Sequence, residues 1–158
     1  MNRRIVIAID ADLSPHTQHM LCVASSLLER TSPHVDAVLL HVIPVPELPR
    51  SKFGRARIAP TERQRELAEQ ALHRARLALQ QQGIVPERIE LLLRSGAPHD
   101  EIVKAASELE ADLVMIGSRG SSFRQKLRRV VTGSTSRQVI KSGTCPVMVV
   151  SLPLASSW

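Results

Sequence analysis

Short, continuous apolar runs alternate along this chain with longer segments in which apolar residues recur at helical spacing. The runs cover residues 5–9, 37–43, 89–93, 113–116 and 147–150. Such runs are typical of strands in a parallel sheet, because helices cover both faces and leave no face for polar side chains. Connections between parallel strands are almost always right-handed crossovers. We therefore predict an α/β fold: a single doubly wound domain with a five-stranded parallel sheet and four helices on both faces.

Polar caps, prolines and glycines mark the ends of the predicted helices. Ser14 followed by Pro15 opens the first helix. Thr61 and Gln64 have the spacing of a capping box at the start of the second helix, which Gly83 stops.

The second half of the chain contributes the other two helices. The third begins at residues 97–98, and the fourth runs from about residue 127 to residue 141. Residues 44–60 are rich in proline and basic residues and show no period, so we expect a mobile surface loop there. We expect a flexible tail at residues 152–158 and one domain over residues 1–158.

The net charge of +6 at pH 7 is unevenly distributed. Residues 113–158 contain seven basic and no acidic residues, whereas residues 1–112 contain 14 basic and 15 acidic ones. This asymmetry favours one local anion site or one docking face over a generally nucleic-acid-coating surface. Only Phe53, Phe123 and Trp158 are aromatic, which leaves no platform for stacking bases, so we expect no nucleic-acid partner.

Membrane segments, disulfides and metal sites are not indicated by the sequence. No apolar stretch approaches the length of a membrane helix, so we expect a cytoplasmic protein without membrane insertion. Cys22 and Cys145 lack metal or redox spacing and are expected to be buried hydrophobic residues. His16 and His19 lie at i, i+3 spacing with no third ligand nearby, which favours a solvated helix start over a metal site.

The predicted fold defines where a ligand site would lie. In doubly wound sheets, ligands collect outside the carboxyl ends of the strands, where the strand order reverses. The candidate segments are the turns after residues 9, 43 and 116.

The turn after the fourth run is rich in glycine, and a second glycine-containing stretch follows it. The two stretches are Gly117-Ser118-Arg119-Gly120 and Gly133-Ser134-Thr135. Glycines let backbone N–H groups approach a phosphate, and the hydroxyls and five basic residues between Gly117 and Gly133 would add to anion binding. A nucleoside triphosphate complements this set, although a basic loop is as often only a solvated face. The spacing is neither a P-loop nor a dinucleotide fingerprint.

Several collinear motifs resemble those of the universal stress protein family of the UspA type. They are DADLSPHT at residues 10–17, LLHV at 39–42, GAP at 96–98, ADLVMIGSRG at 111–120, GS at 133–134 and CPVMVV at 145–150. The resemblance spans almost the whole chain. It implies the strand order 3-2-1-4-5 and, in one branch of the family, ATP bound by a G-x2-G-x9-G-[ST] motif. It also implies a homodimer joined through the last strand, Val147, Met148, Val149 and Val150.

The resemblance also implies roles for individual residues. The acidic residue that ends the first strand, either Asp10 or Asp12, would flank the adenine together with Val42. Gly117 and Gly120 would approach ribose and phosphates. The remaining members of the implied nucleotide-binding set are Met115, Ser118, Arg119 and the phosphate-holding residues Gly133, Ser134 and Thr135.

This chain departs from the family pattern at two places. Twelve residues separate Gly120 from Gly133 where the ATP-binding motif has nine, and Leu13 stands between Asp12 and Ser14 where the family often has glycine.

Three functions remain open on the sequence alone. The first is a regulatory stress-response module that binds an adenine nucleotide, ATP with or without Mg²⁺. The second is a nucleotide-free module that docks an acidic partner through the basic loop, and the third is a binder of another adenine ligand such as a cyclic nucleotide. No catalytic residue is indicated, because no carboxylate lies beyond residue 112, and ATPase or autokinase turnover would be slow.

Overall fold

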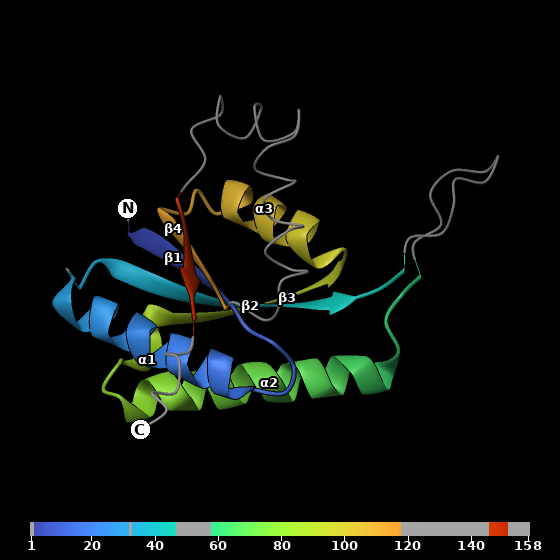
Figure 1. Cartoon of the computed structure of the whole chain (residues 1–158), viewed down its shortest axis with the longest axis horizontal. Helices are drawn as coiled ribbons and strands as arrows, with labels where there is room; N and C mark the ends of the chain where they lie inside the picture. The colour runs from blue at the N-terminus through green and yellow to red at the C-terminus, as the bar shows by residue number, and fades with distance from the viewer. Residues whose placement is uncertain (1, 32, 47–57, 118–145, 152–158) are drawn as a thin grey trace, which may run out of the picture.

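A parallel sheet of five strands forms the centre of the molecule (Figure 1). The computed structural model describes residues 2–31, 33–46, 58–117 and 146–151. The strands are β1 (Arg3–Ala8), β2 (Val35–Pro44), β3 (Ile89–Gly96), β4 (Leu113–Gly117) and β5 (Val147–Val150). Their order is β3-β2-β1-β4-β5, and every neighbouring pair is parallel. The predicted sheet and its strand order are confirmed.

Helices cover both faces of this sheet, as predicted. Helices α1 (Pro15–Arg30) and α2 (Glu62–Gln81) lie on one face, and α3 (Pro98–Glu108) lies on the other (Figure 1). A short 3₁₀ helix, η1 (Pro86–Arg88), precedes β3. The predicted fourth helix lies outside the described residues, as do most of the predicted loop and the predicted tail.

The two faces of the sheet have separate hydrophobic cores, because successive strand side chains point in opposite directions. In β1, Ile5 and Ile7 pack with α1 and α2, whereas Val6 between them packs with α3. Both cores are well sealed: Ile7 and Val6 are fully buried. Burial on both faces explains why the central strands read as continuous apolar runs.

Side-chain caps fix where α1 and α2 begin, and both were predicted. The Ser14 hydroxyl accepts a hydrogen bond from the Thr17 amide at 3.4 Å. Thr61 and Gln64 form the reciprocal capping box, with each side chain accepting from the other residue's backbone amide. These bonds satisfy amides that would otherwise lack partners in the first helical turn.

The prediction that Cys22 is buried is wrong. Cys22 is exposed on α1, and its sulfur accepts a hydrogen bond from the Gln82 side-chain amide at 3.4 Å. Cys145 lies outside the described residues. None of the helices in the described part combines the length and the apolar character needed to cross a bilayer.

Gly96, at the junction of β3 and α3, cannot be replaced without strain. Its φ is 144°, and a Cβ built there would lie 2.9 Å from Cγ of Glu101. We therefore expect Gly96→Ala to lower the free energy of unfolding by about 2 kcal/mol or more, measured by urea denaturation. Gly117→Ala is the control, because among the described residues its Cβ would meet only the His16 Cβ, at 3.9 Å, and it should change stability by less than about 0.5 kcal/mol. Equal effects of the two substitutions would contradict this account.

Candidate ligand-binding pocket

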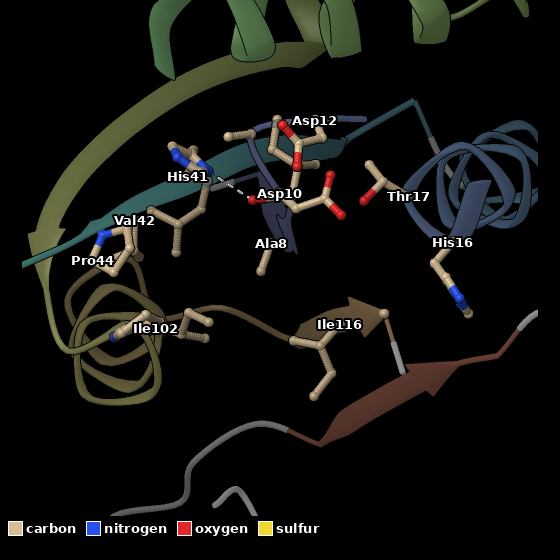
Figure 2. Close-up of a pocket in the computed structure, with 15 residues that line it drawn as sticks. Ala8, Asp10, Asp12, His16, Thr17, His41, Val42, Pro44, Ile102 and Ile116 are labelled. Atoms are coloured by element: carbon tan, nitrogen blue, oxygen red, sulfur yellow. Dashed lines mark hydrogen bonds between the residues drawn. The ribbon is translucent and has the colours of Figure 1, made fainter. Parts of the chain in front are cut away.

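A cavity of about 440 Å³ opens at the carboxyl ends of β1, β2 and β4 (Figure 2). Its volume falls in the range of small-molecule sites. In the sheet, β1 lies between β2 and β4. The chain passes from β1 to β2 and β3 on one side and then crosses to β4 and β5 on the other, so the strand order reverses at β1, where the cavity lies. The cavity therefore occupies the edge at which the sequence predicts a ligand.

One wall of the cavity is apolar and lies on the α3 face of the sheet. Val42 and Pro44 at the end of β2 face Pro98 and Ile102 in the first turns of α3, and Ile116 of β4 completes the wall. In Figure 2 Val42, Pro44 and Ile102 lie together on one side of the cavity. An apolar wall of this kind suits the face of a flat heterocycle.

An ion-pair network braces the helix that supplies part of this wall. Arg94 of β3 pairs with Glu108 of α3 and lies 3.5 Å from Glu101, which in turn lies 3.5 Å from Lys104. The hydrogen bond from Arg94 lowers the pKa of the Glu108 carboxyl, and the Glu108 carboxylate raises the pKa of Arg94. Because the Glu108 pKa falls on folding, this stabilisation is present at neutral pH and is lost as the pH drops through the range of the carboxyl.

The opposite rim of the cavity carries carboxylates. Asp10 and Asp12 both line it, from the turn between β1 and α1. The Asp10 carboxylate accepts two hydrogen bonds from Ser14, one from the backbone amide at 3.2 Å and one from the hydroxyl at 2.6 Å. The same serine caps α1, so the first turn of the helix holds the Asp10 carboxylate in one orientation.

The structure explains one departure from the family pattern, the leucine at position 13 where the family often has glycine. Its φ is 47°, in the left-handed region that glycine adopts without strain. A leucine there costs about 1 kcal/mol or more. Its partly buried side chain packs against the core on the α1 and α2 face, and that contact offsets the strain. The turn therefore keeps the backbone shape that glycine favours without containing glycine.

His41 links the ends of the two strands that bound the cavity. Its Nδ1 lies 2.9 Å from the Ile9 carbonyl oxygen, and the side chain is buried. Because a carbonyl only accepts, Nδ1 of His41 carries the proton. The bond joins β2 to β1 beyond the last paired residues of β1, at the cavity rim (Figure 2).

His16 lies at the other end of the cavity, in the first turn of α1 beside Gly117. Its Nδ1 is buried and has no hydrogen-bond partner among the described residues. The side chain as a whole is partly exposed, so the burial concerns this one nitrogen. No group of three or more potential metal ligands is present in the described part of the chain.

The structure brings four of the predicted site residues together. Asp10, Asp12, Val42 and Gly117 all line the cavity. Met115 is fully buried in the core on the α1 and α2 face of the sheet and is not one of the lining residues. The other predicted residues, Ser118, Arg119, Gly120, Gly133, Ser134 and Thr135, lie outside the described residues.

Several lining residues were not predicted from the sequence as part of the site. They include His16, Thr17, His41, Pro98 and Ile102. Pro98 and Ile102 could have been placed near the site only from the topology, because α3 begins at the carboxyl edge of β3. His16 and Thr17 follow the predicted cap directly, so their proximity to the site could have been inferred.

The sheet and the cavity together define an open α/β domain with a ligand pocket at its topological switch point. A sequence model of the Universal stress protein family matches residues 1–151. The chain belongs to this family.

Two curated relatives illustrate the similarity in sequence. Universal stress protein MJ0531 of Methanocaldococcus jannaschii is 33% identical over 89 residues, which cover 56% of this chain and 49% of that protein. Universal stress protein G of Shigella flexneri is 35% identical over 114 residues, which cover 71% of this chain and 75% of that protein. The match thus spans about half of the first relative and three quarters of the second.

Solved structures share the fold at lower sequence identity. A universal stress protein in complex with cAMP has a TM-score of 0.60 and 18% identity, covering 95% of this chain and 97% of that chain. The universal stress protein of Archaeoglobus fulgidus in complex with dAMP has a TM-score of 0.57 and 20% identity, covering 94% and 97%. A family member from Arabidopsis thaliana with AMP bound has a TM-score of 0.59 and 17% identity, covering 99% and 96%.

Proposed function

We propose that this protein binds an adenine nucleotide at the carboxyl ends of β1, β2 and β4, with ATP as its ligand, and acts as a regulatory module in a stress response. One observation carries the proposal: a single cavity at this edge joins an apolar wall to a carboxylate rim. The base would lie against Val42 and Ile102. The carboxylates of Asp10 and Asp12 would accept hydrogen bonds from amino or hydroxyl groups of the nucleoside.

Two further observations support an adenine nucleotide over other small molecules. The chain belongs to the universal stress protein family, and structures with the same fold were solved with cAMP, dAMP and AMP. The glycine-rich and basic stretch that follows Gly117 in sequence would supply the phosphate contacts, including Gly120, Gly133, Ser134 and Thr135.

The test is to identify what the purified protein carries and binds. The chain has one tryptophan and no tyrosine, so its own absorbance near 280 nm is weak and a bound adenine would dominate near 260 nm. We expect chromatography of the denatured protein to release an adenine nucleotide, and calorimetry to detect ATP binding in the presence of Mg²⁺. A protein without 260 nm material that gives no heat up to about 1 mM ATP would refute the proposal.

A structural neighbour was solved in complex with cAMP, so a cyclic nucleotide is a competing candidate for the ligand of this pocket. Competition between cAMP and ATP in the same calorimeter separates the two. Displacement of ATP only by cAMP concentrations far above those of ATP supports ATP as the ligand, and the reverse order would assign the pocket to a cyclic nucleotide.

We also propose that the protein is a cytoplasmic homodimer joined through β5. This strand is at the edge of the sheet, and its Val147 and Val149 are 45% and 40% exposed. An exposed apolar edge strand favours pairing with a second copy. A monomeric mass by light scattering at micromolar concentration would refute the dimer.

A further inference from the structure

His16 differs from the other pocket histidine in what its ring contacts. Nδ1 of His41 donates to a carbonyl, whereas Nδ1 of His16 is buried without a partner among the described residues. Buried polar atoms are nearly always hydrogen-bonded, so such an atom in a cavity wall indicates a bond that is completed by something else. The other buried side-chain atom without a partner in the described part, Nε of Arg76, is on α2 and outside the cavity.

The position of His16 indicates which part of a ligand it would meet. Figure 2 shows His16 across the cavity from Val42 and Pro44, near the end of β4. A base against the apolar wall would direct the sugar and phosphates toward His16. Gly117 has no side chain there, and the His16 Cβ is the one atom of the described residues within 4 Å of a Cβ built at Gly117.

The charges of the lining side chains indicate which group of the ligand His16 would bind. The titratable side chains of described residues that line the cavity are Asp10, Asp12, His16 and His41. Two carboxylates at the rim would repel a phosphate, and His41 already uses Nδ1 within the protein. Among the described lining residues, His16 is therefore the titratable side chain that combines a positive charge on protonation with a ring nitrogen not bonded within the protein, and the N-terminal turn of α1 adds the favourable end of the helix dipole.

We propose that His16 is a specificity-determining residue that binds the phosphate nearest the ribose and so distinguishes nucleotides from the nucleoside. The inference rests on the proposed function, since it assigns one contact within the same pocket. It concerns phosphate recognition by a residue of α1, separate from the glycine-rich stretch.

The test compares adenosine, AMP and ATP as calorimetric ligands of the full chain and of His16→Ala. We expect His16→Ala to weaken AMP and ATP about tenfold and to change adenosine affinity by less than about twofold. His16→Asn retains a polar atom near the Nδ1 position and should recover part of the loss. His19→Asn, on the same helix but outside the cavity lining, is the matched control and should leave all three affinities unchanged.

The outcomes separate this inference from the proposed function. Equal losses for adenosine and AMP in a folded His16→Ala protein would assign His16 a structural role and overturn the inference alone. Unchanged affinity for all three ligands would also overturn it. If the unaltered protein binds none of the three, the proposed function fails and the phosphate contact fails with it.

Discussion

Replacing Met115 with alanine is expected to lower the free energy of unfolding by about 2–5 kcal/mol. Met115 is fully buried in β4, pairs with Ile7 and packs in the core beneath α1 and α2. Deleting its side chain would leave a cavity that the sheet cannot readily close, because β4 is held between β1 and β5. Urea denaturation followed by circular dichroism measures the change.

Met148→Ala provides the control for this substitution. Met148 is opposite Met115 in register but belongs to the edge strand β5 and is only partly buried. Its loss should cost clearly less. The Met115 variant also tests the implied role of this residue in nucleotide binding: if the folded variant binds ATP as tightly as the unaltered protein, Met115 acts only in the core.

Replacing Ala8 with phenylalanine is expected to weaken ATP binding at least 100-fold, about 2.7 kcal/mol. Ala8 lines the cavity at the end of β1, and in Figure 2 it lies between Asp10 and Ile116. A phenyl ring there would fill space that the proposed ligand needs. Because that space is open, we expect the stability of the variant to change much less than its affinity. Calorimetry with ATP and urea denaturation measure the two effects.

The same substitution at an exposed position serves as the control. Ala59 is exposed and precedes α2, so Ala59→Phe should leave the affinity for ATP unchanged. Retained binding in Ala8→Phe would move the nucleotide site away from this cavity. Loss of binding in both variants would point to a general effect of an added aromatic side chain.

The sheet could be predicted because its signals are local. Each strand carries its own apolar run, and Ser14 and Thr61 mark helix starts through bonds to residues three positions away. Strand ends were less accurate, since β3 continues to Gly96, beyond the predicted residue 93. Ser95 and Gly96 are polar or lack a side chain, and they are extended because they pair with the end of β2.

Only the part of the site that lies at the strand ends could be predicted from the topology. The carboxyl edge follows from the fold, and Asp10 and Gly117 follow from the turns after residues 9 and 116, whereas Val42 was implied only by the resemblance to the family. The roles of His16 and Cys22 depend on how α1 is rotated against the sheet. Cys22 has apolar neighbours in sequence, but Leu21 is buried while position 22 faces outward. Sequence neighbours on a helix point about 100° apart, so local apolarity misled the prediction.

The bond between the His41 imidazole and the Ile9 main chain has a kinetic consequence. Together with the two hydrogen bonds from Ser14 to the Asp10 carboxylate, it fixes the half of the cavity formed by Asp10 and His41 before a ligand arrives. A ligand that enters loses its own freedom but does not have to order these residues. We therefore expect this half of the pocket to set no slow step in association, and related ligands to differ mainly in how long they stay bound.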